Sequence, residues 1–180
     1  DIIKCKENLG FGQANNIGIR KAYDAGADYV FLMNQDVYVE PNTIEKLIEL
    51  SNNHPEYGII SPMHLNGLGT TLDYKFSNYI VPHLCPNLYS DIFLNTFSKE
   101  IYELPFVNAA SWLITRQCIE NVGGFNPSFF HYGEDDNYCQ RVLYHNLKIG
   151  IVPRAIIYHD REKRINNKYF EDKILVEKRR

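Results

Sequence analysis

An acidic side chain stands directly after one of the longest apolar runs of the sequence. Residues 29–33 read Tyr-Val-Phe-Leu-Met, and Asn34, Gln35 and Asp36 follow them. In open α/β sheets, ligands bind beyond the carboxyl ends of the strands. A carboxylate there could hold a hard divalent cation whose remaining ligands are phosphate oxygens. The same residues could instead form a strand-ending turn in which Asn and Asp cap backbone groups.

Three consecutive carboxylates form a second candidate group. Glu134, Asp135 and Asp136 follow an aromatic stretch at residues 129–132 and lead into a predicted helix. One of them could act as a general base while the others hold it in place, and Arg141 is near enough along the helix to tie it to the site. Acidic residues also stabilise the N-terminus of a helix through its dipole, so capping is the alternative.

Three further features each have a functional and a structural interpretation. Residues 8–18 form a glycine-rich segment that opens a predicted helix, where free backbone N–H groups could contact a phosphate or base, or small residues could allow close packing. The segment matches neither the dinucleotide-binding nor the P-loop pattern. His159, at the end of the last predicted strand, is a candidate ligand or a structural histidine. Trp112 could stack on a sugar or fill the core.

Alternating strands and helices must position these residues. The apolar run at 29–33 is typical of a parallel strand covered on both faces. Strands are also expected at residues 2–5, 57–62, 105–115, 148–153 and 155–158, and helices at 13–25, 41–53, 117–122 and 135–145. Residues 63–104 show no sustained period, which predicts a polar hairpin at about 70–82 and then a long loop. This rhythm indicates an α/β layer architecture.

Composition excludes several classes of protein. The 180 residues are 44% hydrophobic and 23% charged, which is typical of one globular domain. A net charge of −3 gives no indication of a nucleic-acid partner. No apolar run approaches the ~20 residues of a membrane-spanning helix. The four cysteines lack zinc-site spacing and are expected to be free, mostly buried thiols in a reducing cytosol.

Taken together, four segments resemble the family-2 glycosyltransferases of the GT-A fold, most closely the rhamnosyltransferase-like branch. In family order they are NLGFGQANNIG (8–18), ADYVFLMNQDV (27–37), residues 105–141, which include GGFNPSFFHYGED, and KIGIVPRAIIYHD (148–160). The resemblance implies an α/β fold in which a mixed sheet is flanked by helices over residues 1–160. It also implies transfer of a sugar from a nucleotide-diphosphate donor to a saccharide or lipid-linked acceptor.

The resemblance also implies roles for single residues. Asp36 would bind Mg²⁺ or Mn²⁺ on the donor diphosphate, with Asn34 in place of the family's first acid, and His159 matches a late histidine that approaches the metal or diphosphate. Asp135 would be the general base of an inverting transfer, supported by Glu134, Asp136 and Arg141. The residues expected to bind the donor are Asn8, Gly10, Asn16, Asn34, Asp36, Ala109 and Trp112.

Both ends of the sequence carry an expectation. Family members begin with a strand, a helix and a second strand that binds the nucleotide; residues 1–7 resemble the strand that follows these, so we expect a truncated domain. If the nucleotide-binding elements are missing, a non-catalytic fragment or a carbohydrate-binding remnant is a second possible function. A sugar nucleotidyltransferase is a third, but the Gly-Glu-Asp segment at 133–135 is not typical of that class. Residues 161–180 form a basic, helical tail that could contact anionic lipid at the inner face of the membrane or be simply solvated.

Overall fold

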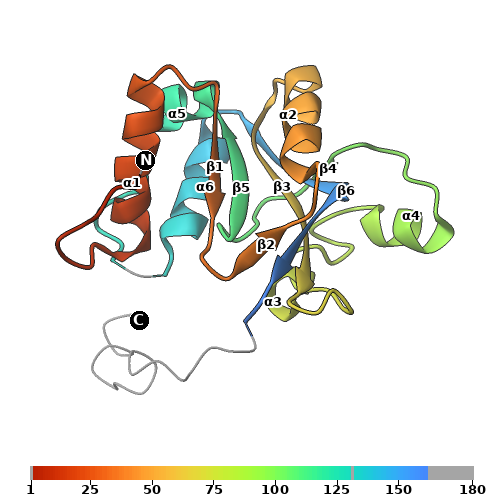
Figure 1. The fold of residues 1–180 in the computed structure, drawn as a ribbon. Coiled ribbons are helices and arrows are strands. Elements are labelled where there is room, and N and C mark those ends of the chain that lie inside the picture. The colour runs from red at the N-terminus through yellow and green to blue at the C-terminus, as the bar shows by residue number, and fades with distance from the viewer. Residues whose placement is uncertain (1, 131, 162–180) are drawn as a thin grey trace.

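A mixed β-sheet with helices on both faces forms the body of the molecule (Figure 1). The structure, a computed structural model, describes residues 2–130 and 132–161. The strands are β1 (Tyr29–Met33), β2 (Val37–Val39), β3 (Tyr57–Asn66), β4 (Tyr102–Glu103), β5 (Ser111–Thr115) and β6 (Lys148–His159). The helices are α1 (Gly10–Asp24), α2 (Thr43–Asn53), α3 (Tyr74–Ser77), α4 (Leu88–Leu94), α5 (Arg116–Val122) and α6 (Glu134–Tyr144). The expected fold class is confirmed.

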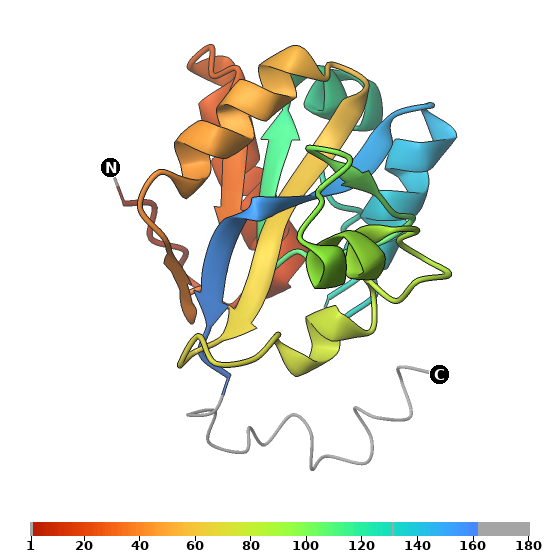
Figure 2. The ribbon, with the colours of Figure 1, turned by 90° about the vertical axis from the view of Figure 1, so that its right-hand side faces the viewer.

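The sheet has the strand order β1-β5-β3-β6-β2, and β4 pairs with β6 outside this path. β3 and β6 run parallel and lie side by side in Figure 2, whereas the other pairings are antiparallel. The prediction of a parallel strand at 29–33 is therefore wrong, because β1 pairs antiparallel with β5 at the edge of the sheet. Its apolar run has another cause: Val30 and Leu32 pack into one core layer and Phe31 into the other.

Two core layers follow from the alternation of side chains along each strand. Ile59 and Trp112 point into the larger layer beneath α1, α5 and α6, while Ile60 and Leu113 point into the smaller layer beneath α2. β3 is buried along its first eight residues, as expected of a central strand. The sheet is thus fixed from both sides, and the ends of its strands are where polar side chains can gather.

Four local expectations differ from the structure. Residues 2–5 are not a strand, and β5 begins only at Ser111. The two expected final strands are one continuous β6, in which a register shift between Val152 and Ile156 replaces the expected break. The segment expected to be a hairpin and loop contains α3 and α4, which are too short to produce a detectable helical period. Of the predicted basic tail, all but Arg161 lies outside the described residues.

Two expectations about the chain as a whole can be compared with the structure. The four cysteines are free, and Cys85, Cys118 and Cys139 are buried, which confirms the expected thiols. Within residues 2–130 and 132–161, no helix has both the length and the apolar character needed to span a bilayer.

We predict that Gly150→Ala lowers the free energy of unfolding by about 1–3 kcal/mol, the usual cost of overpacking. A Cβ at this position of β6 would lie 2.2 Å from Ile101 Cγ2 and 2.7 Å from Tyr57 Cε1. Both neighbours are buried and cannot turn away freely. Urea unfolding of the variant and of the wild-type protein measures the difference.

Gly18→Ala is the matched control, because a Cβ on this α1 residue would have no neighbour within 4 Å. The same addition of one methyl group should here be neutral or stabilise the helix by up to about 1 kcal/mol. Equal destabilisation by both substitutions would show that the crowding around Gly150 is not the cause.

Candidate active site

Asp36 and His159 are brought together by the pairing of β2 with the end of β6. Val37 lies opposite His159 in the antiparallel register, and the Asp160 backbone N–H donates to the Asp36 carbonyl oxygen at 2.8 Å. As a result Asp36 Oδ1 lies 3.3 Å from His159 Nε2. The histidine side chain is fully buried and the aspartate is one-fifth exposed. The two residues expected to hold the metal ion are therefore neighbours.

A second carboxylate, Asp73, faces the other nitrogen of the same histidine. Asp73 Oδ2 lies 3.6 Å from His159 Nδ1 and accepts a hydrogen bond from Arg161 Nε at 2.6 Å. Asp73 Oδ1 accepts from the backbone N–H groups of Lys75 and Phe76, so the residue is also the N-cap of α3. The sequence prediction missed Asp73. The sequence offered no signal for it, because Asp73 lies in the segment expected to be a hairpin and α3 is too short to show a helical period.

Glycines allow the turn after β3 to approach this site closely. A Cβ on Gly67 would lie 2.9 Å from the Cα of Asp160, and one on Gly69 would lie 2.7 Å from the Tyr158 ring. Gly69 also has a φ of 69°, which disfavours residues with a side chain. Figure 2 shows this turn beside the ends of β3 and β6. The glycines therefore let the segment that carries Asp73 lie against His159.

Behind His159 lies a second buried histidine, His64. Its ring stacks on Phe76 with centroids 4.4 Å apart, and its Nε2 lies 3.0 Å from Ser61 Oγ. Because the serine hydroxyl donates its proton to the Ser111 carbonyl oxygen at 2.8 Å, it must accept from His64 Nε2–H. Complete burial holds the pKa of His64 well below its ordinary value, and the nearby His159 and Arg161 act in the same direction. His64 is thus a neutral support for the site.

Asp135 lies in the first turn of α6, where the expected base should be. Its Oδ2 accepts from the Ala109 backbone N–H at 3.4 Å, and its Oδ1 accepts from the Asp136 backbone N–H at 3.0 Å. Burial raises the pKa of Asp135 above its ordinary value, although these N–H groups oppose the shift. A raised pKa makes a carboxylate a stronger base, as general base catalysis requires.

Tyr79 is a half-buried tyrosine whose pKa is affected by both Asp135 and Asp73. Its ring packs edge-on against Phe106 with centroids 4.8 Å apart. Burial raises the pKa of Tyr79, the charges of Asp135 and Asp73 raise it further, and Arg161 opposes them. The Tyr79 phenol therefore lies within electrostatic range of both carboxylates.

The three residues expected to support Asp135 have different environments. Glu134 is buried, which raises its pKa, and the charge of Asp135 adds to that effect. Asp136 is exposed and accepts a hydrogen bond from Gln140. Arg141 donates to the carbonyl oxygens of Val122 at 2.7 Å and Gly124 at 2.6 Å. Arg141 therefore holds α6 against the end of α5, and its support of the site stays a prediction.

The residues expected to bind the donor near the N-terminus make structural contacts. Asn8 Oδ1 accepts from the Gly10 N–H, and a Cβ on Gly10 would lie 2.1 Å from the Phe130 carbonyl oxygen. Asn16 bonds both the N–H and the carbonyl oxygen of Phe125. These contacts favour the close-packing interpretation of residues 8–18. The structure does not bring this segment into contact with the Asp36–His159 pair through any hydrogen bond among the described residues.

The other expected donor residues lie in β5, just before it, and just after β1. Trp112 is completely buried and stacks on Phe125, which favours the core-filling interpretation over stacking on a sugar. Ala109 is buried and reaches the site through its N–H bond to Asp135. Asn34 begins the turn that leads to Asp36, because its N–H donates to the Ala110 carbonyl oxygen and its own carbonyl oxygen accepts from Val37.

Asp36 and His159 suit a divalent cation as a partial set of ligands. Among the described residues, no three His, Cys, Asp or Glu side chains converge as a complete metal-binding group. A carboxylate oxygen and an imidazole nitrogen 3.3 Å apart supply two donors of types that Mn²⁺ accepts. Mg²⁺ and Mn²⁺ commonly take their remaining ligands from substrate phosphates and water. The residues present therefore fit an ion that arrives with a diphosphate.

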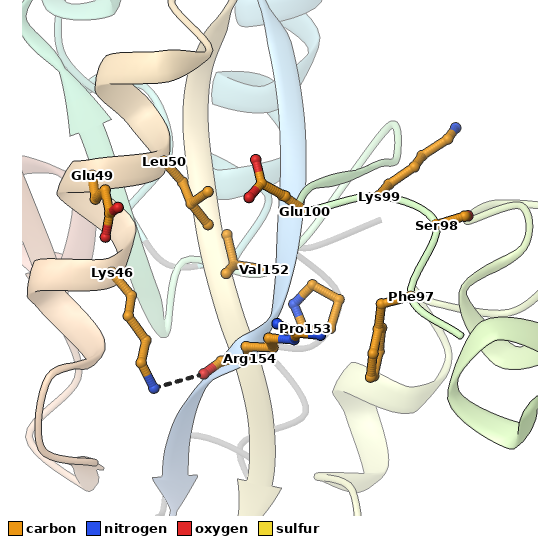
Figure 3. A pocket seen from close by; sticks show the side chains of 10 residues that line it. All are labelled: Lys46, Glu49, Leu50, Phe97, Ser98, Lys99, Glu100, Val152, Pro153 and Arg154. Atoms are coloured by element: carbon orange, nitrogen blue, oxygen red, sulfur yellow. Dashed lines mark hydrogen bonds between the residues drawn. The ribbon is translucent and has the colours of Figure 1, made fainter. Parts of the chain in front are cut away.

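A pocket of about 470 Å³ lies beside residues 152–154 of β6, between α2 and residues 97–100 of the segment after α4 (Figure 3). Two contacts lie within its wall: Lys46 Nζ donates to the Arg154 carbonyl oxygen at 3.1 Å, and the Arg154 guanidinium lies over the Phe97 ring. Glu100 lies 3.4 Å from His54. None of the residues expected in the active site lines this pocket.

The architecture and the site identify the class of the protein. The structure superposes with a TM-score of 0.67 on the crystal structure of GalNAc-T7 with UDP, GalNAc and Mn²⁺, at 16% sequence identity, covering 92% of this chain and 32% of that one. This likeness shows a shared fold, and the expected GT-A fold is confirmed.

The glycosyl transferase family 2 profile matches residues 1–123, and the chain belongs to that family. A profile described as the N-terminal domain of galactosyltransferase matches residues 106–164. The low-salt glycan biosynthesis hexosyltransferase Agl10 of Haloferax volcanii is 28% identical over 148 residues, which are 79% of this chain. The chain spans 46% of the length of that relative.

We predict that the buried His64 makes stability decline in mild acid. The unfolded chain binds a proton near the ordinary pKa of 6.5, whereas the folded chain does not, so the free energy of unfolding falls as the pH drops below 6.5. The slope contributed by one such histidine is at most roughly 1.4 kcal/mol per pH unit. His64→Gln should flatten the slope measured by urea unfolding between pH 7 and pH 5.

His83→Gln is the control for this measurement, because His83 is exposed. It should leave the pH dependence of stability as in the wild-type protein. If His64→Gln retains the full slope, the decline arises from other groups.

Proposed function

We propose that this chain carries the catalytic part of a glycosyltransferase that moves a hexosyl or deoxyhexosyl group from a nucleotide-diphosphate donor to a saccharide or lipid-linked acceptor. The observation that carries the proposal is the Asp36–His159 pair, 3.3 Å apart at the end of the sheet, in a chain that also holds the partly buried Asp135 with its pKa raised. The family match and the hexosyltransferase relative support this reaction class. The rhamnosyltransferase-like segments of the sequence are the reason to include deoxyhexoses.

Asp135 would be the general base of an inverting reaction. An acceptor hydroxyl attacks the anomeric carbon from the face opposite the diphosphate, the bond from that carbon to the phosphate oxygen breaks, and the hydroxyl proton passes to Asp135. Two N–H groups hold the carboxylate: that of Ala109 orients Oδ2 and that of Asp136 orients Oδ1. The raised pKa of Asp135 increases its affinity for the proton that it must accept.

Asp36 and His159 would hold Mg²⁺ or Mn²⁺ at the end of the sheet. The ion, when bound, would neutralise the negative charge that grows on the departing nucleoside diphosphate. The fold neighbour GalNAc-T7 was crystallised with UDP, GalNAc and Mn²⁺, which supports a metal-dependent nucleotide-sugar donor here. Asp36 brings the charge that attracts the ion, and the burial of His159 fixes the direction of its ring.

We predict that Asp135→Asn reduces sugar transfer by at least about 100-fold, the lower range of general base contributions. The amide keeps the size of the side chain but cannot accept the proton. Binding of a UDP- or dTDP-sugar in the presence of Mn²⁺, measured by calorimetry, should persist because the Asp36–His159 pair is intact. Transfer is measured from the same donors to an oligosaccharide acceptor.

Asp24→Asn is the matched control, since it removes a carboxylate whose ion pair among the described residues is with the exposed Arg20 on α1. Undiminished transfer by Asp135→Asn would contradict the assignment of the base. A wild-type protein that binds oligosaccharide but no nucleotide-sugar, with or without Mn²⁺, would instead support a carbohydrate-binding remnant.

We also infer a cytoplasmic location at the inner face of the membrane, where a lipid-linked acceptor would be reached. The support is the sequence of residues 160–180, with eight Lys or Arg against five Asp or Glu. The protein should float with liposomes that contain anionic lipid at low salt and less so at physiological salt, because salt screens the attraction. Failure to float at either salt concentration would discard the contact.

A further inference from the structure

Both ring nitrogens of His159 face a carboxylate. Nε2 is directed at Asp36 Oδ1, 3.3 Å away, and Nδ1 is directed at Asp73 Oδ2, 3.6 Å away. The histidine is buried completely and Asp73 is 2% exposed, so water does not screen the contact between them. Asp36 and His159 are the expected ligands of the cation, whereas Asp73 lies on the far side of the imidazole.

Asp73 is fixed at three points. Its backbone N–H donates to the His64 carbonyl oxygen at 2.8 Å, which attaches it to the end of β3. Its Oδ1 accepts from two N–H groups at the start of α3, and its Oδ2 accepts from Arg161 Nε. These bonds determine the rotation of the carboxylate. Oδ2 is thereby held toward His159, and the orientation does not depend on the histidine itself.

The chemistry of imidazole explains why this position matters. A histidine that binds a cation through Nε2 must carry its proton on Nδ1, and an acceptor at Nδ1 selects that arrangement. At 3.6 Å the contact with Asp73 is electrostatic rather than a hydrogen bond. In a site closed to water, a negative charge at that distance still favours the N–H dipole that points toward it.

We propose that Asp73 is a positioning residue, which favours a proton on Nδ1 of His159 when Nε2 of the same ring binds the divalent cation beside Asp36. The inference rests on the proposed function, since it concerns the same cation. Asp73 lies outside the four segments that resemble the family. It would thus both cap α3 and orient His159. Arg161 takes part by holding Oδ2 in place.

Asp73→Asn tests the proposal with little change in shape. Asparagine is as good an N-cap as aspartate, so its Oδ1 can still accept from Lys75 and Phe76. Its NH₂ group then replaces the acceptor that faces His159 Nδ1. The affinity for Mn²⁺ alone, followed by electron paramagnetic resonance of the free ion, should fall about 10- to 100-fold, the usual effect of removing such a partner.

A second measurement needs no metal ion. In the metal-free protein Asp36 favours a proton on Nε2 of His159 and Asp73 favours one on Nδ1. In ¹⁵N spectra at pH 8, the share of the Nδ1-protonated tautomer should therefore be larger in the wild-type protein than in Asp73→Asn. A structural defect alone would not move the proton from one nitrogen to the other. If the variant does not fold, the wild-type spectrum in the presence of Mg²⁺ still decides, because a proton on Nε2 rather than on Nδ1 of His159 there overturns the proposal.

Asp91→Asn is the matched control. Asp91 is another buried aspartate that accepts hydrogen bonds, from Ser98 and Tyr102, but it lies at α4 away from His159. The variant should lose stability without changing Mn²⁺ affinity or the ¹⁵N signals of His159. Equal Mn²⁺ affinity in wild type and Asp73→Asn overturns the positioning role alone. Absence of Mn²⁺ binding to the wild-type protein rejects the metal site itself, and with it this role.

Discussion

The site depends on one short pairing, in which three residues of β2 lie antiparallel to the end of β6. That pairing sets Val37 opposite His159 and joins the Asp160 N–H to the Asp36 carbonyl oxygen. The glycine turn after β3 closes against the same end of β6, and the closure brings Asp73 to the remaining face of the imidazole.

Buried carboxylates in this fold are used in two opposite ways. Asp91 accepts hydrogen bonds from Ser98 and Tyr102, and these donors hold the pKa of its carboxyl below the ordinary range. Asp135 is partly buried and accepts only backbone hydrogen bonds of 3.0 and 3.4 Å, so burial outweighs them and its pKa is raised. The first arrangement suits a group that stays ionised and ties α4 to the following segment. The second suits a group that must accept a proton, and the two environments separate a structural role from a chemical one.

Much of the fold could be predicted from periodicity, and part of the site could be predicted from motifs. The apolar run of β1, the face of α2 and the buried β3 were all apparent in the sequence, as was the proximity of Asp36 and His159 implied by the family resemblance. The antiparallel direction of β1 could not be predicted. Both faces of this edge strand are covered, so its continuous apolar sequence is the same as that of a central parallel strand. Asp73 was missed because its importance arises only when β6 ends beside α3.

The edge position of β2 links the ligand site to the least protected part of the sheet. A three-residue strand paired on one side is the kind of element that opens by local unfolding well below the global free energy. When it frays, Asp36 leaves His159 although the core remains folded. A ligand that binds only the closed pair suppresses this opening by mass action. Occupancy of the site and order of the sheet edge would then rise and fall together, so hydrogen exchange at Val37 and Val39 would report on a ligand that touches neither residue.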